Sequence, residues 1–295
     1  MRILVTGATG YIGSELIKKL ENKGYALIVL TRDTSSVNQF LDKNCKVVQF
    51  HDYEEILDIF RCENIHGVIH LASKVVVEHT PENIDNMIQS NITYGTFLLE
   101  ACKESNVKWF INTGTFWQNF ENKDYSPVNL YAATKEAFES ISQYYTETSD
   151  LIFTTLKLND TFGPNDKRPK IFNLWSKIAQ TGEVLNMSSG KQIIDICYIE
   201  DVLNAYELLI NHLKSDYAFQ FKNKTFVVKS DERMSLKEMS IVFEKATDTS
   251  LNINWGGKEH RKREVMLPWE YGNVVPGWKQ KYSLKEAIIK TIKKG

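Results

Sequence analysis

Short apolar runs alternate with amphipathic segments through the first half of this chain of 295 residues. The runs that predict strands are 2–5, 26–30, 46–50, 67–71, 107–112 and 151–158. Between them, residues 54–62 and 82–105 have the apolar spacing of helices, as do Leu16, Ile17 and Leu20. Because strands that alternate with helices build parallel sheets, this pattern predicts an α/β fold with a Rossmann-like, doubly wound parallel sheet.

The pattern changes after Gly163 and Pro164. Short strands and helices then mix without strict alternation, in segments 170–181, 184–189, 192–199, 202–213, 225–229, 235–246 and 283–293. We therefore expect residues 1–163 to form the main domain, with strands contributed from later segments, and residues 164–295 to form a smaller α/β substrate lobe. Such a lobe would lie over the carboxyl edge of the sheet, where open α/β sheets bind ligands.

A glycine motif follows the first apolar run. Gly7, Gly10 and Gly13 have the spacing Gly-x-x-Gly-x-x-Gly, directly before a helical pattern. Glycine permits a tight turn, close approach of the backbone to a pyrophosphate, and close packing of the helix on the strand. A turn that only reverses the chain is the alternative. The strand–turn–helix context favours a dinucleotide site, with contacts from Gly7, Thr9, Gly10, Tyr11, Ile12 and Gly13.

The end of the second strand bears on the choice of cofactor. An acidic residue at this position would bind the adenosine ribose and repel a 2′-phosphate. Here the residues are Thr31 and Arg32, and an arginine can clamp a phosphate and stack on adenine. The sequence therefore favours NADP(H). NAD stays possible, because Arg32 could lie in an exposed loop where Asp33 neutralises it.

Tyr131 and Lys135 form a Tyr-x-x-x-Lys pair in a segment that we expect to be helical. Side chains that are four positions apart on a helix lie on the same face. A phenol beside an ammonium group is a proton donor or acceptor whose pKa is lowered toward working pH. The pair alone also fits a packing tyrosine and a surface lysine. Downstream of a dinucleotide motif, it predicts hydride chemistry at a carbonyl or alcohol carbon.

These residues resemble the extended short-chain dehydrogenase/reductase family, in particular its nucleotide-sugar branch, over nearly the whole chain. The motifs that carry the resemblance are Thr6 to Gly13, His51-Asp52, His70 to Ser73, Asn91 to Thr96, Tyr131 to Lys135, Phe162-Gly163-Pro164, Asp195 to Asp201 and Gly277-Trp278. Few of them are specific singly, but their order and spacing together identify the family.

The resemblance implies roles for matching residues. Asp52 would contact the adenine amino group, and Ala72 and Ser73 would line the nicotinamide side of the cleft. Lys135 would bind the nicotinamide ribose as well as tune Tyr131. The family's third catalytic group is a Ser or Thr at the end of the fifth strand, which matches Thr115, with Thr113 as the less favoured choice. Further cofactor contacts are expected at Thr31, Arg32, Tyr53, Leu71, Asn91 and Thr113.

The residues after Thr115 bear on the reaction. Dehydratases of this branch need an Asp-Glu pair there, but this chain has Phe116 and Trp117, which cannot transfer protons. The segment is similar to that of the CDP-abequose and CDP-paratose synthase group, which reduces 4-keto nucleotide-linked dideoxy sugars. We therefore expect NADPH-dependent reduction at C4, with Tyr131 as proton donor. A 4-epimerase that retains NAD is the alternative, and a non-catalytic dinucleotide sensor is a remote one.

The expected substrate is a nucleotide-linked sugar. Candidate substrate residues are Lys74, Thr115, Asp160, Lys191, Arg261 and Arg263, of which the last three could bind a diphosphate. Family members usually carry an arginine at the position of Ile194 and many have an asparagine at that of Asp160. These two departures bear on which nucleotide and which sugar bind. The basic turn at 261–263 could equally be a solvated surface.

Composition adds few further constraints. The formal net charge of −1 gives no reason to expect nucleic acid or a membrane as partner. Four dispersed cysteines suit free thiols in a reducing compartment, so a cytoplasmic protein is expected. The histidines lack metal-ligand spacing, so no metal is expected. By resemblance, we expect a homodimer formed by helices near residues 86–104 and 131–149.

Overall fold

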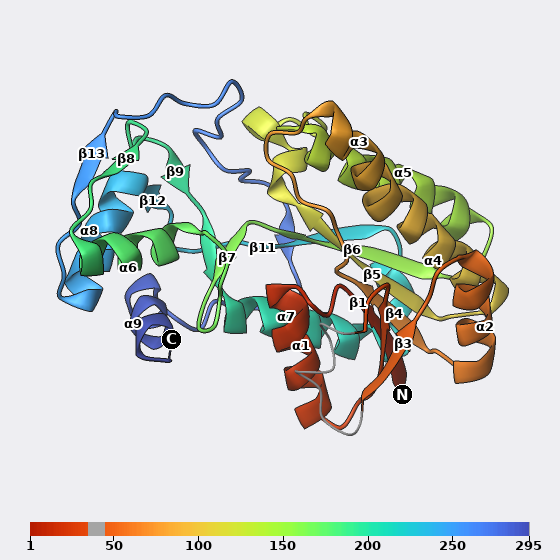
Figure 1. Ribbon diagram of the computed structural model, residues 1–295. Coiled ribbons are helices and arrows are strands. Elements are labelled where there is room, and N and C mark those ends of the chain that lie inside the picture. The colour runs from red at the N-terminus through yellow and green to blue at the C-terminus, as the bar shows by residue number, and fades with distance from the viewer. Residues whose placement is uncertain (35–44, 295) are drawn as a thin grey trace.

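The centre of the molecule is an eight-stranded sheet, in a computed structural model that describes residues 1–34 and 45–294 (Figure 1). Its order is β14-β11-β6-β5-β4-β1-β2-β3 and every pairing is parallel. The strands are β1 (Arg2–Thr6), β2 (Ala26–Thr31), β3 (Cys45–Gln49), β4 (Gly67–His70), β5 (Trp109–Thr115), β6 (Ile152–Leu158), β11 (Lys224–Val228) and β14 (Asn273–Val274). The predicted doubly wound parallel sheet is confirmed.

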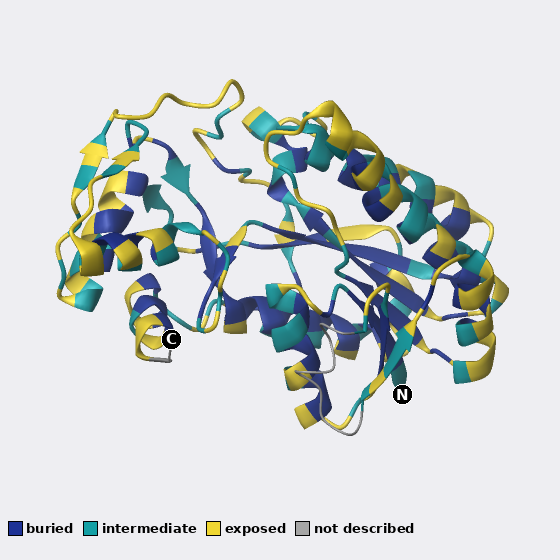
Figure 2. Cartoon of the chain, viewed as in Figure 1, coloured by how far each residue is buried: buried dark blue, intermediate teal, exposed yellow. Residues whose placement is uncertain are grey.

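Helices cover both faces of this sheet (Figure 1). On one face lie α1 (Tyr11–Asn22) and α7 (Ile199–Leu213), and on the other lie α2 (Tyr53–Glu63), α4 (Tyr94–Glu104) and α5 (Leu130–Glu147). Successive residues of a strand point to opposite faces: Ile3 and Val5 join the core under α1, whereas Leu4 joins the core under α2. The central strands β1, β4 and β5 are therefore buried on both sides, as Figure 2 shows, whereas the edge strand β3 is partly exposed.

The helical segment expected over 82–105 is confirmed. It consists of α3 (Pro81–Ile88), a π-helical turn over Gln89–Thr93, and α4. Widened turns of this kind occur frequently at functional sites, and here the turn contains the fully buried Asn91. Across residues 1–34 and 45–294, no helix is both long enough and apolar enough to cross a membrane.

A smaller group of elements lies at one end of the sheet, on the left of Figure 1. Its helices are α6 (Ile171–Thr181), α8 (Leu236–Thr247) and α9 (Leu284–Lys294), and its strand pairs are β7 (Asp160–Phe162) with β10 (Ile196–Tyr198), β8 (Leu185–Met187) with β13 (Ile253–Trp255), and β9 (Ile193–Ile194) with β12 (Met234–Ser235). The rings of Phe172, Trp175 and Phe243 pack together inside it. The chain returns from this lobe to form β11 and β14, while the domain boundary at residue 163 stays a prediction.

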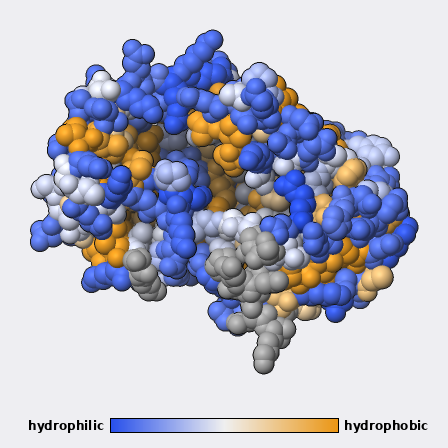
Figure 3. Space-filling view, in the orientation of Figure 1, coloured by the Kyte–Doolittle hydropathy of each residue, from blue (hydrophilic) through white to orange (hydrophobic). Residues whose placement is uncertain are grey.

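The carboxyl ends of the central strands position the site. Thr6, His70 and Thr115 end β1, β4 and β5, and Thr115 lies in register with Leu158 at the end of β6. The chain passes directly from β6 into β7 of the lobe. The lobe therefore faces this edge of the sheet, and Figure 3 shows the surface hollowed between the two parts.

Candidate functional site

The glycine motif turns sharply between β1 and α1. Gly7 has a φ of +73°, and a Cβ added there would lie 2.6 Å from the backbone nitrogen of Ala72. A Cβ on Gly13 would lie 2.1 Å from the carbonyl oxygen of Gly7. Both positions therefore require glycine for steric reasons. Gly10 caps α1 and donates its N–H to the Gly7 carbonyl oxygen at 3.0 Å, so the first amides of α1 face the cleft, as an anion site needs.

A recess of about 220 Å³ lies beside this turn. Its wall consists of Gly7, Thr9, Gly10, Leu30, Thr31, Arg32, Phe50, Leu71, Ala72, Ser73 and Tyr94. The Phe50 and Tyr94 rings stack with centroids 4.8 Å apart, which gives the recess an aromatic wall. The structure therefore brings Thr9, Thr31 and Arg32 together as expected for an adenosine subsite. Sequence reasoning missed Phe50 and Tyr94, because both look like ordinary core residues.

Asp52 and Tyr53 begin α2 outside the wall of this recess. The Asp52 carboxylate accepts a hydrogen bond from the backbone N–H of Glu55 at 3.0 Å and so caps the helix. The Tyr53 hydroxyl donates to a carboxylate oxygen of Glu104 at 3.1 Å. Their expected contacts with a cofactor stay predictions.

Asn91 anchors the segment that follows β4. Its side-chain carbonyl accepts from the Ser73 hydroxyl at 3.0 Å and from the Lys74 N–H at 2.7 Å. Its amide group donates to the Lys74 carbonyl at 3.0 Å and to the Thr134 hydroxyl at 2.9 Å. Asn91 therefore holds Ser73 in place against α5, on which Tyr131 lies.

A larger cavity, of about 350 Å³, continues from the glycine turn toward the lobe. It is lined by Gly7, Gly10, Tyr11, Ile12, Gly13, Leu71, Ser73, Val75, Thr113, Gly114, Thr115, Trp117, Tyr131, Leu158, Asn159, Asp160, Thr161, Arg168 and Lys170. The expected catalytic Thr115 and Tyr131 thus share one cavity with the expected cofactor residues Tyr11, Ile12 and Ser73. The set comes from segments far apart in the sequence, so the fold has assembled it.

Tyr131 lies in the first turn of α5, which Asn129 caps by accepting from the Ala132 N–H at 3.0 Å. Burial raises the pKa of its phenol to about 12, and a hydrogen bond with Ser73 offsets part of that rise. The expectation of a lowered pKa is therefore wrong, because desolvation outweighs the neighbouring polar groups. Tyr131 holds its proton at neutral pH, as a proton donor must.

Lys135 lies one turn further along α5 and is only 1% exposed. Burial lowers the pKa of its ammonium group to about 8, while the negative charge of Glu139 acts in the opposite direction. Glu139 is one more turn along the same helix, so the three side chains share a face. The expected pair is thus extended by a carboxylate that helps Lys135 keep its charge.

Gln118 connects the end of β5 to α5. It is fully buried in the 3₁₀ helix η2 (Phe116–Gln118). Its side-chain oxygen accepts from the Thr115 N–H at 2.8 Å, and its amide group donates to Glu136 at 2.6 Å and to Glu139 at 2.9 Å. Gln118 therefore fixes Thr115 relative to the helix of Tyr131 and Lys135. Sequence reasoning missed it, because a lone glutamine after a strand carries no signal of its own.

Thr113 and Thr115 both line the cavity, but their hydroxyls are placed differently. The Thr113 hydroxyl shares a hydrogen bond of 2.6 Å with the hydroxyl of the buried Tyr206 on α7. The Thr115 hydroxyl accepts from backbone N–H groups of η2, including that of Trp117 at 3.3 Å, which leaves its proton free to be donated. This geometry favours Thr115 as the group that binds the reacting oxygen.

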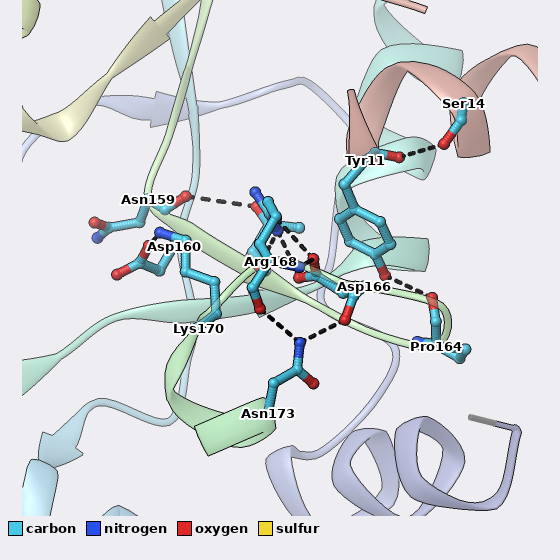
Figure 4. Close-up of polar contacts among 10 residues, drawn as sticks. Tyr11, Ser14, Asn159, Asp160, Pro164, Asp166, Arg168, Lys170 and Asn173 are labelled. Carbon is cyan, nitrogen blue, oxygen red and sulfur yellow. Dashed lines mark hydrogen bonds and ion pairs between the residues drawn. The ribbon is translucent and has the colours of Figure 1, made fainter. Parts of the chain in front are cut away.

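Charged residues stand at the lobe side of the cavity (Figure 4). Asp160 forms an ion pair of 2.6 Å with Lys170, which precedes α6 as its N-cap residue. Lys170 therefore offsets the repulsion that Asp160 would exert on a phosphate, and the positive end of the α6 dipole adds to this. Sequence reasoning missed Lys170, because a single lysine at the start of the predicted segment 170–181 carries no signal of its own.

Arg168 links the same side of the cavity to the glycine turn (Figure 4). Its guanidinium group lies 4.8 Å from the centre of the Tyr11 ring and donates to Asp166 at 2.7 Å and 2.8 Å. The Tyr11 hydroxyl donates to the Pro164 carbonyl at 3.1 Å. The loop after β7 is thereby fixed to the turn that would hold the cofactor, which joins the two expected binding regions.

Four expected substrate residues lie outside the wall of the larger cavity: Lys74, Lys191, Arg261 and Arg263. Lys74 and Lys191 are exposed. Arg263 donates to the Ser126 hydroxyl at 2.8 Å and lies over the ring of Phe120, and Arg261 forms an ion pair of 3.8 Å with Glu78. The two arginines thus join the segment after β13 to the main domain, and their expected contacts with a diphosphate stay predictions.

Comparisons with known proteins agree with this architecture. Residues 3–222 match the family described as NAD dependent epimerase/dehydratase. CDP-abequose synthase of Salmonella muenchen is 28% identical over 294 residues, which cover 99% of this chain and 97% of that protein. CDP-abequose synthase of Yersinia pseudotuberculosis is 29% identical over 296 residues, with both chains covered completely.

A solved structure shares the fold. UDP-glucuronic acid 4-epimerase from Bacillus cereus, in complex with UDP-glucuronic acid and NAD, has a TM-score of 0.85 to this chain. It is 20% identical and covers 99% of this chain, with 98% of its own chain covered. At this level of identity, the likeness shows the fold alone.

The burial of Lys135 predicts that a neutral replacement stabilises the protein. The folded-state pKa of about 8 lies below the ordinary 10.5, so folding disfavours the charged form, and this cost is fully present below pH 8. We expect Lys135→Met to raise the free energy of unfolding at pH 7 by about 1–3 kcal/mol. The difference should shrink as pH rises from 8 toward 10.5, when the wild-type lysine loses its proton in both states. Urea unfolding measured at pH 7 and pH 10 checks this.

Lys245→Met on the exposed side of α8 is the matched control, and we expect its effect to be small at both pH values. A stability difference for Lys135→Met that stays constant between pH 7 and pH 10 would contradict the assignment of the cost to the buried charge.

Proposed function

Because the chain belongs to the NAD dependent epimerase/dehydratase family, we propose that it reduces the C4 keto group of a nucleotide-linked 4-keto-dideoxyhexose with NADPH. The likeness to two CDP-abequose synthases over the full chain supports this substrate class. The observation that carries the proposal is the phenol of Tyr131. It lines the same cavity as Thr115 and the glycine turn and retains its proton at neutral pH.

The residues of the cavity suit each part of a reduction. NADPH supplies the hydride that adds to C4. Tyr131 donates its phenolic proton to the C4 oxygen, on which negative charge develops as the π bond of the carbonyl group breaks. Thr115 donates a hydrogen bond to the same oxygen, and the Lys135 ammonium group stabilises the phenolate that Tyr131 becomes. The product is the C4 alcohol, so hydride and proton together balance the step.

Two other reactions of the family are distinguished by particular residues. Dehydration needs acid and base groups after the catalytic threonine, where this chain has the buried Phe116 and the cavity residue Trp117. A nucleotide-sugar 4-epimerase is the second candidate, because the cavity could serve oxidation and reduction in turn and a solved 4-epimerase has this fold. An epimerase consumes no net reductant, which separates it from a reductase.

Replacement of Tyr131 tests the proposed proton donor. With a nucleotide-linked 4-keto-dideoxyhexose, we expect the wild type to consume NADPH, followed by loss of the absorbance of the reduced nicotinamide. Tyr131→Phe should lower kcat by about 10²- to 10⁴-fold, because the general acid is lost, while NADPH binding changes little.

Tyr217→Phe, at an exposed tyrosine, is the control and should leave kcat unchanged. Wild-type protein that consumes no NADPH with the 4-keto sugar but interconverts two C4 epimers would replace the reductase by the epimerase. A Tyr131→Phe variant within tenfold of the wild-type kcat would exclude the phenol as the acid.

Arg32 supports the preference for NADPH over NADH. It lies exposed in the wall of the smaller recess, directly after β2. A guanidinium group there can bind the adenosine 2′-phosphate, and hydrogen bonds to charged groups contribute about 1.5–3 kcal/mol.

We expect Arg32→Ala to weaken NADPH binding by about 10- to 100-fold while NADH binding changes by less than threefold, since only NADPH carries the 2′-phosphate. Titration of both reduced cofactors into both proteins, followed by fluorescence, checks this. For each protein, NADH binding is the control for NADPH binding. Wild-type protein that binds NADH more tightly than NADPH would contradict the preference.

A homodimer through α4 and α5 is also proposed. Phe97 on α4 and Tyr144 on α5 are 36% and 56% exposed, which suits two helices that meet their counterparts across a symmetry axis. We expect the wild type to be a dimer at micromolar concentration and Phe97→Glu to be monomeric, as measured by light scattering. A monomeric wild type would contradict this proposal.

A further inference from the structure

We propose that Trp117 is a specificity-determining residue that selects a sugar with a methyl group, rather than a hydroxymethyl group, beside the reacting carbonyl. This inference rests on the proposed function, because it concerns the sugar bound in the same cavity. It adds the residue that distinguishes a 6-deoxy sugar from its 6-hydroxylated counterpart.

Trp117 is fixed next to the reacting position. Its indole lines the larger cavity, and its ring centre lies 6.4 Å from that of Tyr131 with the rings at 76°. The backbone holds it there: its N–H donates to the Thr115 hydroxyl at 3.3 Å, and its carbonyl accepts from the Val128 N–H at 2.8 Å. A sugar whose C4 oxygen meets Tyr131 therefore has a substituent of a neighbouring carbon within reach of this indole.

Other apolar residues contribute to the same cavity. Val75 lines it and is 56% exposed, and the buried Leu158 lines it at the end of β6. Together with Trp117, these side chains offer contact to a methyl group but no hydrogen-bond acceptor to a hydroxyl.

The side of the cavity toward the lobe is polar. Asn159, Asp160, Arg168 and Lys170 line it, and Figure 4 shows them grouped on the segment that runs from β6 to α6. Sugar hydroxyls and phosphate oxygens find partners there. The cavity thus separates an apolar side at Trp117 from a polar side at the lobe, and a 6-deoxyhexose joined to a diphosphate has the same separation of groups.

The cost of placing a hydroxyl against Trp117 sets the expected selectivity. Burying a hydroxyl without a hydrogen-bond partner costs about 1–3 kcal/mol on scales from protein mutations, and apolar pockets reject an added hydroxyl by about 10²-fold. We therefore expect wild-type kcat/KM to be about 10- to 100-fold higher for a 4-keto-6-deoxyhexose than for the matching 6-hydroxylated 4-ketohexose.

The experiment compares these two substrates, as CDP-4-keto-6-deoxyglucose and CDP-4-ketoglucose, with NADPH. Trp117→Gln gives the hydroxyl an amide partner, and we expect it to reduce the preference at least tenfold. Trp117→Phe keeps an apolar ring, and it should retain the preference within about threefold. Thermal unfolding and NADPH binding are measured for all variants, because a residue that only supports the fold would change both substrates equally.

Val75→Asn gives a second test that does not depend on the packing of Trp117. Because Val75 is exposed, the variant should fold normally, and it should also lower the preference for the 6-deoxy substrate. Activity on both substrates with no preference in the wild type, or an unchanged preference in both Trp117→Gln and Val75→Asn, would overturn this inference alone. Absence of NADPH consumption with either substrate would overturn the proposed function and this inference with it.

Discussion

The hydrogen bonds of Gln118 are the constraint on which the reactive geometry depends, because the reactive groups come from two separate elements. Thr115 ends β5, whereas Tyr131 and Lys135 lie on α5. Gln118 bonds to the Thr115 backbone with one end of its amide and to the carboxylates of α5 with the other. A buried polar group that loses its partner costs about 1–3 kcal/mol, so any displacement of the strand relative to the helix is opposed. The cavity therefore keeps the spacing of Thr115, Tyr131 and Lys135 without help from a ligand.

Burial of charge beside this cavity explains why the phenol suits a reduction. Lys135 and Lys157 both lower the pKa of Glu139, although burial raises it overall, so opposite charges compensate one another where each alone would be costly. This compensation between opposite charges does not extend to Tyr131, because desolvation raises the pKa of its phenol to about 12. A phenol with that pKa is a poor base at neutral pH. It is nevertheless a sufficient acid for an alkoxide, which is a stronger base than a phenolate, and so in the proposed reduction Tyr131 would give up its proton as hydride adds.

The sequence predicted what depends on local pattern and not what depends on distant contacts. Alternating apolar runs gave the parallel sheet, and sterics at Gly7 and Gly13 explain why the glycine spacing was a reliable sign of the turn. Asn91 and Thr134 are 43 residues apart, and Gln118 and Glu136 are 18 apart, so no local pattern shows that they meet. The pKa of Tyr131 was predicted in the wrong direction for the same reason, since the extent of burial is a property of the whole fold. The contacts of Arg261 and Arg263 with Glu78, Ser126 and Phe120 also join segments far apart in the chain, so no local pattern shows them.

The cavity is polar on one side and apolar on the other, and this difference affects how a substrate would be oriented. The lobe side carries the Asp160–Lys170 and Asp166–Arg168 ion pairs, whereas the indole of Trp117 and the side chain of Leu158 line the side near the sheet. An ionised diphosphate placed against the apolar side would lose its hydration without gaining partners, at a cost of several kcal/mol. A substrate with one ionic end and one deoxygenated end can therefore bind in one orientation at low cost. Under the proposed function, that orientation would place the carbonyl beside Tyr131 and Thr115, so the forces that select the substrate would also align it for proton transfer.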